Sequence, residues 1–451
     1  MLSSVGVARR ATAGFIFGRA LASRIQLPVG RSINSARSYA VSLMPELRRA
    51  DDGLILDSAD KNGRRKEEHL SADWLRDGCA CHLCINGDTQ QRRLKLNEVP
   101  LNPRIASFQV TGTGFEVKWN DGHESSFSWE WISAVNNSQI QFNHRQRLWT
   151  GQMARDAPQV LFQDVMTPGR ETGMAKLLDT IRVWGFCFVN KTPVTPQATE
   201  QLLENIGPIR NTHYGAFYDF QPDLAKADTA YTNLALPLHT DTTYFTEPAG
   251  LQAFHILSHT PTQQPCQQLM DDETEQMPSN DAKETNGDLG GSSVLADGFM
   301  AAQQLQLEAP QEFDILTRVS VPWHCSGNED VAIAPDRPHP VIQLHQGACN
   351  KIRWNNSDRG YLAPGKTTAQ WYKAARKWEA ILERRSSQFW VQLEPGRVLI
   401  FDNWRVLHGR SAFEGLRRIC GGYINRDDFV SRWSLTNHPR QQVIWQNMRV
   451  R

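Results

Sequence analysis

Leu238-His239-Thr240-Asp241 places a histidine and an aspartate two residues apart in an apolar part of the chain. The flanking residues 234–238 and 242–245 are apolar or β-branched, which favours a strand around the pair. Because side chains two positions apart on a strand lie on the same face, both could bind one metal ion from one side. A His-x-Asp pair also occurs by chance, so it is a weak signal when taken alone.

A third metal ligand would have to come from a distant part of the chain, and His408 is the leading candidate. It follows the run from Val398 to Phe401, which has the composition of a buried strand. Two histidines and one carboxylate on one side of an ion leave the other side open, as in non-haem Fe(II) oxygenases. We therefore predict that His239, Asp241 and His408 are the iron ligands and the catalytic centre.

Three of the eight cysteines predict a second metal site, because they lie together in Cys79-Ala80-Cys81-His82-Leu83-Cys84. A tight cluster is typical of a metal site and not of a disulfide framework, and tetrahedral zinc needs a fourth ligand. If His82 were that ligand, the loop would have to fold back on itself. His123 is the better candidate, since it follows the turn Asn120-Asp121-Gly122 of a hairpin expected from Phe115 to Trp131. A zinc site made of Cys79, Cys81, Cys84 and His123 would have four protein ligands and no open position, so the zinc would be structural.

The first 40 residues have the composition of a mitochondrial presequence. They contain six arginines, no lysine and no acidic residue, and their apolar patch Phe15-Ile16-Phe17 is too short to span a membrane. Arg37-Ser38-Tyr39-Ala40 resembles a site cut by the matrix processing peptidase. The mature chain is therefore expected to begin near Ala40 and to be located in the mitochondrial matrix.

The rest of the chain is mildly acidic. The formal net charge of the whole chain is +1, so residues 41–451, with 43 basic and 48 acidic residues, carry −5. Such a chain is not expected to bind nucleic acid, and its apolar runs are too short to cross a membrane. We expect a β-rich zinc domain at 41–150 and a catalytic domain at 151–440. Residues 262–288 have the composition of a disordered acidic insertion.

Helices and strands of the catalytic domain follow from periodicity and capping signals. Apolar residues at helical spacing predict helices at 174–181, ended by Gly185, and at 371–382. Thr195-Pro196 is typical of a helix N-terminus. Residues 186–189 and 294–296 are expected to form strands.

Four longer segments, in this order along the chain, carry a family resemblance: Trp74 to Cys79, His239 to Phe245, Arg353 to Arg359 and Phe401 to Arg410. They resemble segments of the γ-butyrobetaine and trimethyllysine dioxygenases of carnitine biosynthesis. The resemblance covers nearly all of the chain after the presequence, apart from residues 262–288. Of the two enzyme classes, the trimethyllysine dioxygenases are the more similar.

The resemblance implies a mainly β fold with flanking helices, in which a double-stranded β-helix (jelly-roll) catalytic domain follows a small zinc-binding β domain. Alternation of side chains alone does not distinguish a jelly roll from another barrel. The resemblance also implies Fe(II), O2, 2-oxoglutarate as co-substrate and ascorbate as reductant. The implied reaction hydroxylates N6,N6,N6-trimethyllysine to 3-hydroxy-trimethyllysine and releases succinate and CO2, as the first step of carnitine biosynthesis.

The family motifs further imply the binding residues. Arg417 would hold the far carboxylate of 2-oxoglutarate, a role suited to a bidentate guanidinium, while Arg418 would face the other side of a strand. Ser293 stands in the place of an assisting hydroxyl, and Asn355 in the place that holds the substrate carboxylate. A trimethylammonium group cannot donate a hydrogen bond, so aromatic rings suit it through cation–π attraction. The family's cage corresponds here to Tyr214, Tyr218, Tyr231 and Tyr423.

Other functions remain as alternatives. The chain could be a γ-butyrobetaine dioxygenase, which catalyses the last step of carnitine biosynthesis, a chromatin demethylase, or a non-enzymatic methyl-lysine-binding protein. The acidic mature chain and the presequence disfavour the demethylase, and the intact His239, Asp241 and His408 disfavour a module without iron. The expected partner is a small molecule with a trimethylammonium group, with no nucleic acid or membrane, and the family implies a homodimer.

Overall fold

The computed structural model describes residues 45–59, 64–136, 146–221, 232–261, 289–327 and 330–447. The expected presequence, the expected insertion at 262–288 and Tyr231 lie outside the described residues. The chain divides into two compact units between Phe127 and Ser128.

Two three-stranded sheets form the N-terminal unit. A short helix follows the first sheet, and the Ser71 hydroxyl caps it by accepting a hydrogen bond from the N–H of Trp74 (3.3 Å). The elements are β1 (Glu46–Ala50), β2 (Gly53–Ala59), β3 (Arg65–Ser71), α1 (Ala72–Asp77), β4 (Ile105–Thr111), β5 (Gly114–Trp119) and β6 (Glu124–Ser128), with a 3-10 turn at Leu96–Glu98.

The hairpin expected around Gly122 is confirmed, but its second arm is shorter than predicted. Phe115 and Phe127 face each other across β5 and β6 with ring centroids 5.2 Å apart, and both are buried. Trp129 and Trp131 were predicted to continue the strand, yet they belong to helix α2 (Trp129–Asn136). The strand stops at Ser128 because its hydroxyl accepts a hydrogen bond from the N–H of Trp131 (3.0 Å), which starts a helix.

Two sheets form the centre of the second unit, and among their described strands every pair except β7–β8 is antiparallel. The six-stranded sheet has the order β7-β8-β16-β11-β18-β9, and the four-stranded sheet has the order β10-β17-β12-β15. Their strands are β7 (Gln159–Leu161), β8 (Phe186–Asn190), β9 (Phe217–Phe220), β10 (Leu236–His239), β11 (Leu251–Thr260), β12 (Ser293–Asp297), β15 (Phe389–Val391), β16 (Arg397–Asp402), β17 (Val406–Arg410) and β18 (Leu416–Ile424).

One apolar cluster takes side chains from both sheets, so the sheets pack against each other as two layers. Leu399 and Phe401 of β16 belong to it, together with Leu295 of β12 and Val406 of β17. The alternate residues of β16, Val398 and Ile400, instead pack in a second cluster with helices. This period-two division buries both faces of the strand.

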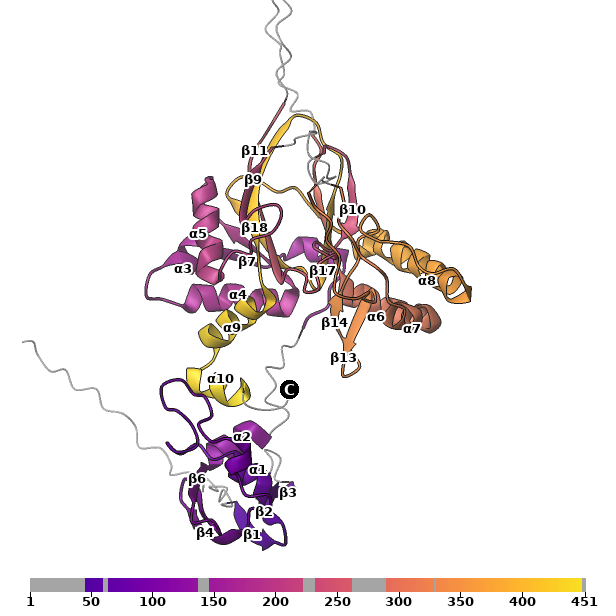
Figure 1. Cartoon of the computed structure of the whole chain (residues 1–451). Coiled ribbons are helices and arrows are strands. Elements are labelled where there is room, and N and C mark those ends of the chain that lie inside the picture. Colours follow the sequence, from indigo (N-terminus) through magenta and orange to yellow (C-terminus); the bar gives the residue numbers. More distant parts are fainter. Residues whose placement is uncertain are drawn as a thin grey trace, which may run out of the picture. The chain divides into compact units, whose positions relative to one another are not determined.

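Helices cover the outer faces of the two sheets. In Figure 1, α3, α4, α5 and α9 lie on the side of β18, and α6, α7 and α8 lie on the side of β10 and β17. The mainly β fold with flanking helices is therefore confirmed. These helices are α3 (Phe162–Met166), α4 (Thr172–Trp184), α5 (Pro196–Ile206), α6 (Gly298–Glu308), α7 (Pro310–Arg318), α8 (Lys366–Leu382) and α9 (Arg426–Asn437).

The helix signals of the sequence are confirmed at atomic detail. Helix α4 ends at Gly185, whose φ of 83° is the left-handed conformation that glycine adopts readily. Thr195 caps α5 by accepting a hydrogen bond from the N–H of Ala198 (3.3 Å). The buried residues of α8 are the six of the predicted apolar stripe: Trp371, Ala374, Ala375, Trp378, Ile381 and Leu382.

The remaining described elements are short. None of the described helices combines the length and the apolar character that crossing a membrane requires. The short elements not yet named are β13 (Ile342–His345), β14 (Ala348–Ile352) and α10 (Arg440–Asn447), with 3-10 turns at Gly151–Arg155 and Arg385–Ser387.

Candidate active site

The structure brings His239, Asp241 and His408 together. Strands β10 and β17 pair antiparallel with His239 opposite His408, and the two imidazole centroids are 4.3 Å apart. The Oδ1 atom of Asp241 lies 3.2 Å from Nε2 of His239 and 3.9 Å from Nε2 of His408. One nitrogen or oxygen atom from each residue lies within 4.8 Å of the others, which is close enough to share one metal ion.

The reason given from the sequence for this convergence is wrong. Strand β10 ends at His239, so Asp241 does not project from the same strand face. The chain turns instead: Thr242 has a φ of 57°, which is uncommon for a β-branched residue. Asp241 lies just beyond the end of the strand, and its carboxylate still comes within 3.2 Å of Nε2 of His239.

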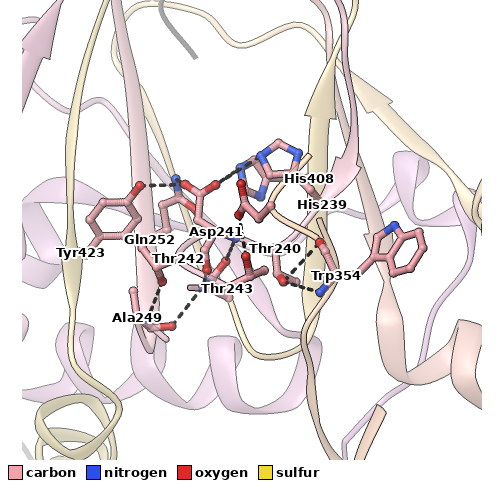
Figure 2. A network of polar contacts seen from close by, with 12 residues as sticks. His239, Thr240, Asp241, Thr242, Thr243, Ala249, Gln252, Trp354, His408 and Tyr423 are labelled. Carbon is pink, nitrogen blue, oxygen red and sulfur yellow. Dashed lines mark hydrogen bonds and ion pairs between the residues drawn. The ribbon is translucent and has the colours of Figure 1, made fainter. Parts of the chain in front are cut away.

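Buried hydrogen bonds hold this turn on both sides (Figure 2). The N–H of Thr240 donates to the carbonyl of Trp354 (2.7 Å), and its hydroxyl oxygen accepts from the N–H of Trp354 (3.0 Å). The Asn403 side chain accepts from the N–H of Asp241 (2.9 Å) and donates to its carbonyl (2.9 Å). The position of the Asp241 backbone is therefore determined by residues more than 100 positions away.

The two carboxylate oxygens of Asp241 have different surroundings. Oδ2 accepts hydrogen bonds from the hydroxyl of Tyr423 (2.7 Å) and the amide of Gln252 (2.5 Å), while Oδ1 faces the histidines (Figure 2). Gln252 is 1% exposed, so this donor is fixed inside the protein. A carboxylate held in this way offers one oxygen to a metal ion. Sequence reasoning missed Gln252, although it is a polar residue within the apolar start of β11.

The three residues differ in the protonation state that their surroundings favour. Burial, and then the charge of His239, lower the pKa of His408 to about 3, so this imidazole is neutral. Burial would raise the pKa of Asp241, but its bond to His239 and the nearby imidazoles hold the pKa well below the usual range. Burial opposes a charge on His239, yet the Asp241 hydrogen bond and charge raise its pKa. A metal ion bound at Nε2 of His239 would have to displace any proton held there.

A cavity of about 240 Å³ opens beside these three residues. Most of the binding residues expected from the family motifs line it, and Tyr231 is not among the described residues. Tyr244, Gln252, Phe254 and Asp358 also line it and were not predicted. The expected residues in its wall are Tyr214, Tyr218, Ser293, Asn355, Arg417 and Tyr423.

Arg417 and Arg418 have opposite environments on β18, as the predicted alternation requires. Arg417 is 5% exposed and lines the cavity, whereas Arg418 forms an ion pair with Asp219 (2.6 Å) on the surface. Burial, and then the charge of Arg410, lower the pKa of Arg417 to about 10, so it stays cationic. No carboxylate pairs with Arg417 among the described residues, and its buried Nε has no hydrogen-bond partner there. A buried cation of this kind suits an anionic ligand.

Aromatic rings gather in another part of the cavity wall. The rings of Tyr218 and Tyr423 have centroids 5.9 Å apart with an interplanar angle of 63°, and the hydroxyls of Tyr244 and Tyr214 are 3.3 Å apart. Tyr218 also donates to the carbonyl of Ala253 (2.7 Å). The faces of such rings attract cations.

The N-terminal unit holds the second predicted cluster. Nε2 of His123 lies 3.2 Å, 3.6 Å and 3.7 Å from the sulfurs of Cys79, Cys81 and Cys84, whereas His82 is exposed. Burial, and then the charge of Cys79, raise the pKa of Cys84 to about 12. The three sulfurs and the imidazole nitrogen lie within 4.8 Å of one another, so the cluster offers the four ligand atoms of a tetrahedral metal site.

Comparisons with known proteins match both units. Residues 146–423 match the model of the "Taurine catabolism dioxygenase TauD, TfdA family", and residues 48–133 match "Gamma-butyrobetaine hydroxylase-like, N-terminal". A trimethyllysine dioxygenase of Neurospora crassa is 47% identical over 91% of this chain and 90% of its own length. The mitochondrial trimethyllysine dioxygenase of Homo sapiens is 36% identical over 79% and 80%. A solved asparagine oxygenase with Fe(II), 3-hydroxyasparagine and succinate is 14% identical, with a TM-score of 0.41 over 56% of this chain and 79% of its own.

Proposed function

Because the chain belongs to the TauD, TfdA dioxygenase family and is a close relative of trimethyllysine dioxygenases, we propose that it hydroxylates N6,N6,N6-trimethyllysine to 3-hydroxy-trimethyllysine. The reaction consumes O2 and 2-oxoglutarate and releases succinate and CO2. The observation that carries the proposal is one cavity wall that combines two histidines and a carboxylate, a buried arginine and several tyrosines.

Fe(II) fits the donor set of His239, Asp241 and His408, since two imidazoles and one carboxylate are the ligands of non-haem iron oxygenases. The Nδ1 atom of His239 lies 2.7 Å from the Pro237 carbonyl, which directs Nε2 towards the site. Iron with bound 2-oxoglutarate supplies the chemistry that breaks an unactivated C–H bond. The protein would supply these three ligands, and co-substrate and O2 would bind on the side of the metal that the protein leaves open.

The other residues position the two organic molecules. Arg417 holds the far carboxylate of 2-oxoglutarate as a bidentate donor, and Ser293 lines the same cavity. Tyr214, Tyr218 and Tyr423 enclose the trimethylammonium group, with Tyr231 as a fourth cage residue, and Asn355 holds the substrate carboxylate. Burial, and then the Asp241 charge, raise the pKa of Tyr423 well above its usual value, so its hydroxyl stays a donor to Asp241.

The finer expectations for the rest of the chain belong to the same proposal. The two packed sheets are read as a double-stranded β-helix, and Cys79, Cys81, Cys84 and His123 as the ligands of a structural zinc. The domains are then a presequence at 1–40, a zinc domain at 41–150 and a catalytic domain at 151–440. Ascorbate as reductant and a homodimer are carried over from the family.

The assay is succinate release from 2-oxoglutarate by the purified protein with Fe(II) and ascorbate. We expect trimethyllysine to stimulate release far more than γ-butyrobetaine and to gain one oxygen atom by mass spectrometry. A His408→Ala variant should release no succinate under either condition. Equal or stronger stimulation by γ-butyrobetaine would favour the alternative enzyme, and binding of trimethyllysine without turnover would favour a non-enzymatic module.

Location in the mitochondrial matrix is proposed from the composition of residues 1–40 and is consistent with the name of the human relative. Deleting residues 1–39 should leave the protein in the cytosol while the purified enzyme keeps its activity. A deletion variant that still reaches mitochondria would contradict the proposal.

A further inference from the structure

One turn of the cavity wall presents an amide and a carboxylate side by side. Asn355 and Asp358 both line the cavity, and the N–H of Asp358 donates to the Asn355 carbonyl (3.2 Å). The side-chain oxygen of Asn355 accepts from the N–H of Ser357 (3.0 Å). Since this oxygen is engaged inside the turn, the amide offers its NH2 group, which is a donor, to a ligand.

The carboxylate of Asp358 is held in place by a buried residue next to the metal ligands. The hydroxyl of Thr243, which is fully buried, donates to Oδ2 of Asp358 (2.5 Å), and the backbone carbonyl of Asp358 accepts from the N–H of His324 (2.8 Å). The charge of Asp358 also reaches the site. Burial lowers the pKa of His239 and raises the pKa of Tyr244. The negative charge of Asp358 raises the pKa of both residues.

The charges of the cavity show which group this carboxylate can serve. Arg417 is assigned to 2-oxoglutarate and Asp241 to the metal, so the negative charge of Asp358 belongs to neither. Trimethyllysine carries two cationic groups. The trimethylammonium group has no N–H, whereas the α-ammonium group has three donors that match a carboxylate.

We propose that Asp358 determines specificity by binding the α-ammonium group of the substrate, next to Asn355 at the α-carboxylate. The inference rests on the proposed function and deepens it, because it defines the substrate as a trimethylated α-amino acid. γ-Butyrobetaine has no amino group beside its carboxylate, so it cannot use this carboxylate. The turn that contains Asn355 and Asp358 would therefore let the enzyme distinguish trimethylated α-amino acids from γ-butyrobetaine.

Apart from Asp241, which is assigned to the metal, and Asp358, the described acidic residue in the cavity wall is Glu379 of α8, and its surroundings make it the matched control. Burial, and then the charge of Glu383, raise the pKa of Glu379, and Arg359 acts in the opposite direction. Its charged neighbours are therefore Glu383, directly after the end of its own helix, and Arg359. The charged neighbours of Asp358, in contrast, include His239, which is assigned to the metal.

The test combines a change in the ligand with a change in the protein. The ligands are trimethyllysine and 6-(trimethylammonio)hexanoate, which is the same molecule without the amino group. For the wild-type enzyme we expect KM to be about ten- to hundredfold higher for the deaminated ligand, as a charge-assisted hydrogen bond predicts. Asp358→Asn, which keeps an oxygen for Thr243, should raise KM for trimethyllysine by a similar factor and change KM for the deaminated ligand less than twofold. Glu379→Gln should change neither.

The outcomes separate this inference from the proposed function. Wild-type turnover of trimethyllysine tests the function, whereas the ratio of KM values for the two ligands tests the role of Asp358. Equal KM values in the wild type would overturn the inference whether or not the variant folds. An equal loss for both ligands in Asp358→Asn would also overturn it, since that result would mean that the residue acts only through Thr243 and the fold.

Discussion

At the scale of single residues, the site depends on which oxygen of Asp241 remains available. Tyr423 and Gln252 both donate to Oδ2, and donors behind a metal ligand typically contribute ten- to hundredfold in metal affinity. We expect Gln252→Leu and Tyr423→Phe each to weaken Fe(II) binding by about tenfold or more. Calorimetric titration of the metal-free protein with Fe(II) under anaerobic conditions would measure this directly.

Tyr218→Phe is the matched control for Tyr423→Phe. Both substitutions remove one buried hydroxyl and keep an aromatic ring in the cavity, but the Tyr218 hydroxyl donates to the Ala253 carbonyl and not to Asp241. Metal affinity should therefore be unchanged in Tyr218→Phe. If the two variants lost affinity equally, the contact with Asp241 would have no special role. The comparison also separates the cage ring of Tyr423 from its hydroxyl, which a substitution by leucine would remove together.

At the scale of elements, strand β18 assigns different roles to two adjacent arginines. Arg417 faces the cavity and Arg418 pairs with Asp219 on the surface. Arg417→Met should raise KM for 2-oxoglutarate by about ten- to hundredfold, because a charge-assisted bidentate contact is lost. Arg418→Met should leave that KM unchanged. Steady-state succinate release at varied 2-oxoglutarate measures both, and a larger effect of Arg418→Met would reverse the assignment of the strand faces.

Helix ends with local signals were predicted correctly, whereas the end of β10 and the hydrogen bonds of the site, which depend on distant residues, were not. Thr195 and Gly185 mark helix ends through their own chemistry, so the sequence was sufficient there. The strand expected through Asp241 ends at His239, because the backbone N–H of Thr240 bonds to Trp354 and no longer to a neighbouring strand of the sheet. Asn403 and Gln252 were missed as site residues for the same reason, since no local pattern encodes a hydrogen bond between residues so far apart in sequence.

At the scale of the whole molecule, one buried ion pair connects several parts of the catalytic unit. Arg405 pairs with Asp297 (2.7 Å), and the two side chains are 1% and 0% exposed. Arg405 also donates to the carbonyls of Val183 (3.0 Å) and Arg147 (2.7 Å). Removing one partner leaves an uncompensated buried charge, so Arg405→Met should lower the free energy of unfolding by about 3–5 kcal/mol. Urea denaturation measures this, and a change below about 1 kcal/mol would show that the pair contributes little.

The two proposed metal sites lie in different compact units and should fail in different ways. A structural zinc contributes apparent binding free energies of about 10–16 kcal/mol to folding, which is comparable to the whole stability of a small domain. The open histidine–carboxylate site contributes little to a core that packed sheets and helices already form. We therefore expect Cys84→Ser to abolish zinc binding and unfold the N-terminal unit. His408→Ala should abolish turnover and leave thermal melting nearly unchanged.

Cys349→Ser is the control for the loss of a thiol, because Cys349 is half-buried on β14, in the unit that does not contain the cluster of Cys79, Cys81, Cys84 and His123. Metal content by mass spectrometry should show one zinc per chain in the wild type and in Cys349→Ser, and none in Cys84→Ser. Hydrogen exchange should then show lost protection in β4 to β6 of Cys84→Ser, because the His123 hairpin is no longer tied to the cysteine loop. If Cys84→Ser kept this protection and lost only activity, the cysteine cluster would have a catalytic role and the division between the two metals would be wrong.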